Sequence, residues 1–248
     1  MANAFRVGQL SDTHFLEPGM EPEGTHAYDT LAAFDAVHAH LTDQDVDLVV
    51  VTGDIADHGR AEQYEIAAAA FERLPTPVHA CPGNHDFDAP LRSGFETADV
   101  HTPRVTRHGP WTFAYLDSNA GGFVDDGAGG LVDPPGGERL HGNGTLGDAE
   151  ADWLRQVVAD HDGEHVFVWL HHPPHSDVPL SRDAAYDAEW SALIGDLSDV
   201  RGFGAGHTHV PSTYSFADRP VFVAPSLKNN FDLDASTCLL YTSDAADD

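Results

Sequence analysis

Val-His-Ala-Cys, residues 78–81, runs on toward Gly83-Asn84-His85-Asp86. The short apolar run predicts a buried strand, and Gly83 permits the sharp turn that we expect at its end. Asn84 and His85 then present an amide oxygen and an imidazole at the carboxyl end of the strand, where open α/β sheets bind ligands. Gly-Asn is also an ordinary turn dipeptide, so this tetrapeptide alone is a weak signal.

Four other stretches share this arrangement, in which an apolar, strand-like run ends in polar side chains. They are Asp12-Thr13-His14, Gly53-Asp54-Ile55-Ala56-Asp57, His171-His172-Pro173-Pro174 and Gly206-His207-Thr208-His209. The chain has 17 histidines, so any single one is more often an ordinary core or surface residue than a ligand. Five strand ends that all carry Asp, Asn or His make a metal centre the economical explanation.

The candidate ligands offer oxygen or imidazole donors and no thiolate. They are Asp12, His14, Asp54, Asn84, His171, His207 and His209. This mixture suits Mn, Fe, Zn or Co. Seven donors are too many for one tetrahedral ion but suit two ions about 3.5–4 Å apart that share a carboxylate. We therefore expect two divalent or trivalent metal ions as the cofactor.

Such a centre predicts a phosphoester hydrolase. A hydroxide that bridges two ions attacks phosphorus in line while the ions neutralise the charge on the phosphoryl oxygens. The leaving alkoxide then needs a proton. His85 adjoins a ligand and is not needed as one, which makes it the candidate catalytic acid.

The composition limits the partners. The chain carries 41 acidic and 12 basic residues, with Lys228 as its single lysine, for a formal net charge of −29. This charge repels nucleic-acid phosphates and anionic membranes, so we expect a small-molecule phosphoester as partner, with no nucleic-acid polymer and no membrane. The excess of acid predicts a halophilic protein, because molar salt shortens the range of repulsion to about 3 Å. The oligomeric state stays open.

The length and the cysteines favour one cytoplasmic domain. The 248 residues suit a single α/β domain with a sizeable core. Two distant cysteines, Cys81 and Cys238, imply no disulfide framework and fit a reducing compartment. The first residues have no charged region followed by an apolar one, so we expect no signal peptide. No apolar run approaches the roughly 20 residues of a membrane span.

The pattern of elements predicts an α/β fold with two sheets packed face to face and helices outside each. Strand-like runs alternate with helical patterns in the first half, which indicates parallel pairing. The expected strands are 5–10, 46–51, 78–81, 104–107, 111–116, 165–170, 200–205, 213–216 and 221–224, and the expected helices are 28–41, 61–74, 148–160 and 184–197. The Gly-rich stretch 119–145 predicts a long surface loop.

The five motifs, in this order, resemble the calcineurin-like metallophosphoesterase superfamily over residues 5–227. The resemblance implies a four-layer α/β/β/α sandwich of two mixed β-sheets flanked by helices. It also implies that Asp12, His14, Asp54 and His209 bind one ion, and that Asp54 bridges to a second ion bound by Asn84, His171 and His207. His85 becomes the catalytic acid, and the Asp57 carboxylate orients it.

Within the superfamily, the chain is similar to class III cyclic nucleotide phosphodiesterases. Tyr64, the His-His-Pro-Pro block and Gly144-x-Leu146 carry this similarity. The chain departs from the phosphoprotein phosphatases, which have Arg where this chain has His58. The permanent positive charge that such an Arg offers to a phosphomonoester is therefore not expected at this position. His172 is expected to support the ligands or the fold.

The substrate stays open at this point. The resemblance covers enzymes that hydrolyse cyclic nucleotides or glycerophosphodiesters, and phosphomonoesterases and nucleotide pyrophosphatases on the same scaffold. An inert metal-binding scaffold is the alternative from another class. Loops 15–26, 87–99 and 119–145 separate these activities, and Asn119, His141 and Asn143 are candidates for substrate contact as well as ordinary loop residues.

We expect residues 1–237 to form the domain, truncated at its C-terminus, and residues 238–248 to be non-native. The last eleven residues, Cys-Leu-Leu-Tyr-Thr-Ser-Asp-Ala-Ala-Asp-Asp, resemble the translation of a sequencing adapter. The alternative is a natural strand, 238–242, followed by an acidic tail.

Overall fold

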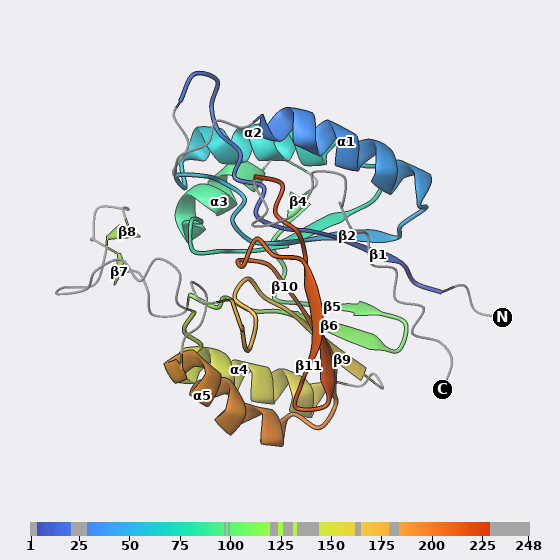
Figure 1. The fold of residues 1–248 in the computed structure, drawn as a ribbon, viewed down its shortest axis with the longest axis vertical. Coiled ribbons are helices and arrows are strands. Elements are labelled where there is room, and N and C mark those ends of the chain that lie inside the picture. The colour runs from blue at the N-terminus through green and yellow to red at the C-terminus, as the bar shows by residue number, and fades with distance from the viewer. Residues whose placement is uncertain are drawn as a thin grey trace.

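The computed structural model describes residues 4–20, 29–96, 98, 100–119, 124–125, 131–132, 144–161, 165–178 and 184–228. Two β-sheets face each other, and helices cover both outer sides (Figure 1). The first sheet has the strand order β1-β2-β3-β4 and is covered by α1, α2 and α3. Its elements are β1 (Val7–Leu10), α1 (Thr30–Asp43), β2 (Leu48–Thr52), α2 (Ala61–Phe71), β3 (Val78–Cys81), α3 (Asp88–Phe95) and β4 (Val100–His101).

The second sheet has the order β11-β12-β10-β9-β6-β5 and is covered by α4 and α5. Its inner strands pair in parallel, whereas β5 and β11 at the two edges pair antiparallel. Its elements are β5 (Val105–His108), β6 (Trp111–Tyr115), α4 (Gly147–Asp160), β9 (His165–Trp169), α5 (Ala184–Leu193), a 3₁₀ turn (Ile194–Asp196), β10 (Val200–Ala205), β11 (Ser212–Phe216) and β12 (Arg219–Val223). A separate ribbon pairs β7 (Val124–Asp125) with β8 (Leu131–Val132).

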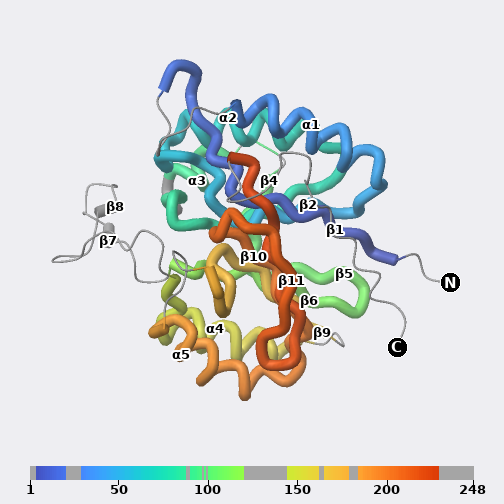
Figure 2. The backbone as a smooth tube through the Cα atoms, in the orientation of Figure 1, coloured from blue at the N-terminus to red at the C-terminus, as the bar shows by residue number. Residues whose placement is uncertain are grey.

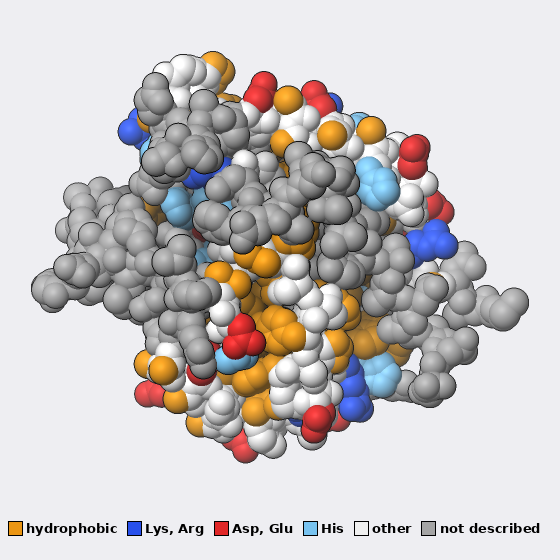
Figure 3. All heavy atoms as spheres, viewed as in Figure 1, with side chains coloured by type: hydrophobic (Ala, Val, Ile, Leu, Met, Phe, Trp, Pro, Cys, Tyr) orange, Lys and Arg blue, Asp and Glu red, His pale blue; other side chains and the backbone are white. Residues whose placement is uncertain are grey.

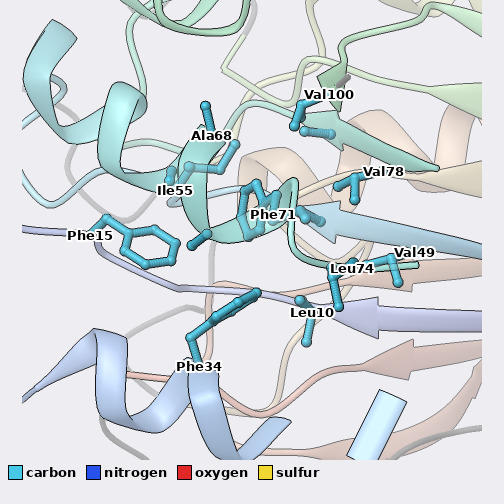
Figure 4. Close-up of a cluster of buried hydrophobic side chains, with 14 of the residues drawn as sticks. Leu10, Phe15, Phe34, Val49, Ile55, Ala68, Phe71, Leu74, Val78 and Val100 are labelled. Atoms are coloured by element: carbon cyan, nitrogen blue, oxygen red, sulfur yellow. The ribbon is translucent and has the colours of Figure 1, made fainter. Parts of the chain in front are cut away.

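Side chains of β2 point alternately to the two faces of the first sheet and so contribute to two different hydrophobic clusters. Every residue of β2 is buried, and successive side chains point to opposite faces of a sheet. Val49 packs in the cluster between the first sheet and its helices, with Phe34 and Phe71 (Figure 4). Its neighbour Val50 packs instead in the cluster between the two sheets, which Trp169 of β9 joins. A third cluster lies between the second sheet and α4 and α5.

The structure confirms the sandwich of two sheets flanked by helices. The mixed pairing that we expected of both sheets is found, within the described residues, only in the second sheet. The first sheet is parallel because a helix-containing crossover connects each successive pair of its strands. The hairpins expected at 104–116 and 213–224 are present as β5–β6 and β11–β12.

Several expectations fall on residues outside the described ranges. These are most of the loop 119–145, with His141 and Asn143, and the whole of the tail 238–248. Among the helices that the structure describes, none has the length and apolar character needed to cross a membrane. On the face drawn in Figure 3, the acidic side chains are scattered around the described surface and do not gather in one patch.

Candidate metal centre

The predicted ligands lie in loops that follow the carboxyl ends of β1, β2 and β3 in the first sheet and of β9 and β10 in the second. The backbone N–H of Asp12 donates to the carbonyl oxygen of Gly53 at 3.0 Å, which joins the first two loops. The backbone N–H of His207 donates to Asp12 Oδ2 at 3.0 Å, which joins the two sheets. Strand ends that are far apart in the sequence therefore converge on one site.

The backbone at this site is strained. Five of the predicted ligands have positive φ angles, between 45° and 69°: Asp12, His14, Asp54, His207 and His209. Residues other than glycine adopt this left-handed region at a cost of about 1–3 kcal/mol each. Such conformations persist only where the surrounding structure holds them, so their concentration here marks a functional site.

One group of ligands gathers around Asp12 and His14. His209 Nε2 lies 3.2 Å from Asp12 Oδ1, and His14 Nε2 lies 3.6 Å from Asp54 Oδ2. The ring centroids of His14 and His209 are 5.5 Å apart. The donor atoms of Asp12, His14 and His209 are close enough together to hold a metal ion.

A second group gathers around Asn84. Its side-chain oxygen lies 3.0 Å from His171 Nε2 and 3.1 Å from His207 Nδ1. The other ring nitrogen of His171, Nδ1, lies 2.8 Å from the carbonyl oxygen of Thr52. A carbonyl only accepts hydrogen bonds, so Nδ1 carries a proton, and Nε2 is the ring nitrogen that would bind a metal ion.

Asp54 connects the two groups. Its Oδ2 lies 3.6 Å from His14 Nε2 and 3.4 Å from His171 Nε2. Its Oδ1 accepts a hydrogen bond from the backbone N–H of His85 at 2.9 Å. The Asp54 carboxylate therefore faces imidazoles of both groups through Oδ2, and the backbone N–H of His85 holds its other oxygen.

His85 and Asp57 are also brought to this site. Nδ1 of His85 lies 2.7 Å from the backbone carbonyl oxygen of Asp57. The Asp57 carboxylate lies 3.1 Å from His14 Nδ1 and 2.6 Å from Lys228 Nζ. We had expected the carboxylate to orient His85, and the structure adds a main-chain contact for that task. His14, Asp57 and His85 have the spacing of a further metal group, but Asp57 Oδ1 already pairs with the lysine ammonium.

Sequence reasoning missed the part that Asp86 plays. This buried carboxylate accepts backbone N–H groups of Ile55, Ala56 and Gly83 at 2.9–3.1 Å and the hydroxyl of Tyr64 at 3.0 Å. It therefore ties the loop after β2 to the loop after β3. Its position next to His85 was the only signal available, and nothing in the sequence shows which backbone groups it meets.

Gly83 serves a purpose other than the one we expected. Its φ is not in the left-handed region, so a turn does not require glycine there. A Cβ at this position would lie 2.3 Å from both the backbone nitrogen and Oδ1 of Asp54. Glycine is needed because the loops after β2 and β3 approach so closely.

The electrostatics of the site favour ionised acids. Burial raises the pKa of Asp12, but contacts with His209 and His171 outweigh this effect and lower the pKa to about 2. Burial likewise opposes ionisation of Asp54, whose pKa is nevertheless well below its usual range because His171 and His85 lie nearby. Burial lowers the pKa of His171, but Asp54 and Asp12 raise it to about 9. Buried carboxylates that draw a proton onto a neighbouring imidazole provide a fitting environment for cations.

The remaining candidates divide into two kinds. His172 is buried beside His207, with ring centroids 4.3 Å apart, and its Nδ1 lies 2.9 Å from Ser118 Oγ. This position fits the expected supporting part. Asn119 hydrogen-bonds to Asp117 and bridges to Thr145, which is ordinary loop chemistry.

Comparison with known proteins gives a consistent result. The profile of the family described as calcineurin-like phosphoesterase matches residues 5–211. A "Probable cyclic nucleotide phosphodiesterase" from Fibrobacter succinogenes is 28% identical over 233 residues, covering 92% of this chain and 81% of that protein. A "Probable glycerophosphodiester phosphodiesterase GpdQ" from Arcobacter nitrofigilis is 29% identical, covering 92% and 80%. The 3′,5′-cyclic adenosine monophosphate phosphodiesterase CpdA of Escherichia coli is 26% identical, covering 89% and 75%.

Known structures share the fold at low sequence identity. A dimetal phosphatase from Danio rerio superposes with a TM-score of 0.64 at 16% identity, over 91% of this chain and 88% of that one. GAP50, the anchor in the inner membrane complex of Plasmodium, gives 0.58 at 13% identity, over 92% and 75%. At these identities the likeness concerns the sandwich alone.

Proposed function

Because the chain belongs to the calcineurin-like phosphoesterase family, we propose that it is a two-metal phosphodiesterase that hydrolyses small-molecule substrates. Asp12, His14, Asp54 and His209 would hold one ion, and Asp54, Asn84, His171 and His207 the other. When bound, two such ions polarise a phosphoryl oxygen and lower the pKa of a water that serves as nucleophile. Manganese, iron, zinc and cobalt all suit these donors.

One observation carries the proposal: Oδ2 of Asp54 lies within 3.6 Å of a ring nitrogen from each ligand group. A carboxylate in that position is what two ions in close proximity require.

His85 supplies the proton chemistry in this proposal. Its Nδ1 is directed at the Asp57 carbonyl oxygen at 2.7 Å, so Nδ1 carries a hydrogen and the opposite nitrogen, Nε2, is the atom that exchanges a proton. With both nitrogens protonated, His85 would donate from Nε2 to the leaving oxygen.

The relatives support a diester as substrate. Those named above are described as acting on cyclic nucleotides or glycerophosphodiesters, and both are phosphodiesters of small molecules. We extend the proposal to a cytoplasmic, salt-adapted enzyme whose residues 1–237 form the catalytic domain, with no nucleic-acid polymer or membrane as partner. The net charge of −29 supports this view.

A substrate panel tests the proposal. The full chain, reconstituted with Mn²⁺ in molar KCl, would be given bis-p-nitrophenyl phosphate, p-nitrophenyl phosphate, 3′,5′-cyclic AMP and glycerophosphoethanolamine. We expect the diesters to be hydrolysed faster than the monoester, and Asp54→Asn to abolish turnover while the surface variant Asp35→Asn retains it. Faster monoester hydrolysis would favour a phosphomonoesterase. Two bound ions without turnover of any phosphoester would establish an inert scaffold.

A further inference from the structure

The single lysine of the chain lies beside the candidate metal centre. Nζ of Lys228 is 2.6 Å from Oδ1 of Asp57, and the two side chains are 9% and 0% exposed. Most of the acidic side chains that the structure describes are exposed, so a lysine has many carboxylates available to it at the surface. A buried pair is costly unless both charges are well compensated, so the location of this ammonium needs an explanation beyond charge balance.

The chain segment after β12 positions Lys228. Ser226 Oγ donates to the carbonyl oxygen of Asp12 at 3.1 Å, and the backbone N–H of Leu227 donates to the same oxygen at 3.2 Å. Ser226 also forms a parallel bridge with Ser11. In Figure 2 this red segment rises from the second sheet toward the first. The lysine is therefore carried on a segment that is fastened to a predicted ligand.

The Asp57 carboxylate lies between Lys228 and His14 and contacts both side chains. The same oxygen, Oδ1, that pairs with the ammonium lies 3.1 Å from His14 Nδ1. A carboxylate offers only acceptors, so it favours the tautomer of His14 with the proton on Nδ1. Nε2 then keeps its lone pair and faces Asp54 Oδ2 at 3.6 Å. Outer partners of this kind orient a ligating imidazole and strengthen its binding of metal.

We infer that Lys228 is a positioning residue for the metal centre, acting through Asp57 on His14. The ammonium holds the Asp57 carboxylate in one orientation, and the carboxylate in turn fixes the ring and tautomer of His14. The inference rests on the proposed function only in taking His14 as a metal ligand. Without the ammonium, the carboxylate would no longer be held in this orientation, and His14 would lose its orienting partner.

A metal titration tests this inference. The metal-free full chain would be titrated with Co²⁺ and followed by visible absorption, for the wild type, Lys228→Met, Lys228→Arg and Arg155→Met. Arg155 pairs with Asp152 and Asp196 on the surface. Arg155→Met is the control because, like Lys228→Met, it removes one positive charge from an ion pair. We expect Lys228→Met to weaken one of two binding steps by about 10–100-fold, Lys228→Arg to restore most of the affinity, and Arg155→Met to match the wild type.

The wild type provides an independent measurement that does not depend on a variant's folding. Because the chain has one lysine, ¹³C-labelled lysine gives a single side-chain Cε resonance. We expect Zn²⁺ to shift it as the site fills. An unmoved resonance at full loading, or unchanged Co²⁺ affinity in folded Lys228→Met, would overturn the inference while leaving the proposed function intact. A wild-type chain that binds fewer than two ions would overturn both.

Discussion

The imidazole of His85 is anchored to the main chain of Asp57, whose carbonyl oxygen lies 2.7 Å from His85 Nδ1. The backbone N–H of His85 in turn donates to Asp54 Oδ1 at 2.9 Å. These two contacts fix both the position and the tautomer of the ring, and they leave its Nε2 as the atom for proton transfer.

Replacing His85 should slow turnover without releasing metal. We expect His85→Ala to retain two ions and to lose about 10²–10⁴-fold in rate on diesters with poor leaving groups, the usual range for general acid catalysis. p-Nitrophenolate needs little protonation, so its esters should be affected less. The measurement is kcat on both classes of substrate, with His40→Ala as an exposed control. Equal losses on both classes would rule out the acid role.

Removing the shared carboxylate should impair both ions. Oδ2 of Asp54 faces ring nitrogens of His14 and His171, one from each group. Asp12 pairs with the imidazole of His209 in the first group and meets the second group through the backbone N–H of His207. We therefore expect Asp54→Ala to bind less metal than Asp12→Ala after gel filtration in excess Zn²⁺, as measured by elemental analysis. Retention of two ions per chain by Asp54→Ala would contradict the bridging arrangement.

Adding a methyl group at Gly83 should separate the loops after β2 and β3. Its Cβ would meet the backbone nitrogen of Asp54 at 2.3 Å, and overpacking of this kind costs about 1–3 kcal/mol. We expect Gly83→Ala to lower the free energy of unfolding by this amount in urea and to weaken metal binding. Gly195→Ala is the matched control, because no atom lies within 4 Å of its added Cβ. Equal behaviour of the two variants would refute this reading.

Acid should destabilise the protein at His79, which lies near the start of β3, whereas the candidate ligand Asn84 follows the end of that strand. His79 hydrogen-bonds to the hydroxyl of Tyr115 at 2.8 Å, and burial, together with His108 and His101, lowers its pKa to about 4. Between pH 6.5 and 4 the unfolded chain binds a proton that the folded chain excludes. The free energy of unfolding should therefore fall across this window, by up to about 3 kcal/mol from this residue.

The test is urea unfolding of the metal-free chain at pH 7 and pH 5. We expect His79→Gln to show a smaller loss on acidification than the wild type, and the exposed variant His40→Gln to show the same loss as the wild type. A pH dependence unchanged in His79→Gln would mean that other groups account for the acid sensitivity.

Salt should stabilise the fold. With a net charge of −29, repulsion among surface acids opposes the compact state, and ions screen it. We expect the melting temperature of the metal-free chain to rise by more than about 5 °C between 50 mM and 2 M KCl, which corresponds to roughly 2 kcal/mol. A melting temperature that does not respond to KCl would argue against a salt-adapted protein.

The amino-acid sequence by itself determined most of the helices and strands, though not α3, β4, β7 or β8, and the places of the candidate ligands along the chain. An apolar run such as residues 48–52 forms a buried strand because burial and alternation act on consecutive residues. The polar residues that follow each run are then carried to a carboxyl end. Since the carboxyl ends of parallel strands meet at one edge, the convergence of Asp12, Asp54 and Asn84 was predictable.

Only the tertiary structure decided the contacts that orient those ligands. The pairing of Lys228 with Asp57, 171 residues apart, and the hydrogen bonds of Asp86 depend on how the loops pack after the strands have paired. The same holds for Asp57, which meets His85 through a carbonyl oxygen that every residue possesses. Such contacts leave no pattern in the sequence, because they arise between groups whose proximity is set by the whole fold and not by their chain neighbours.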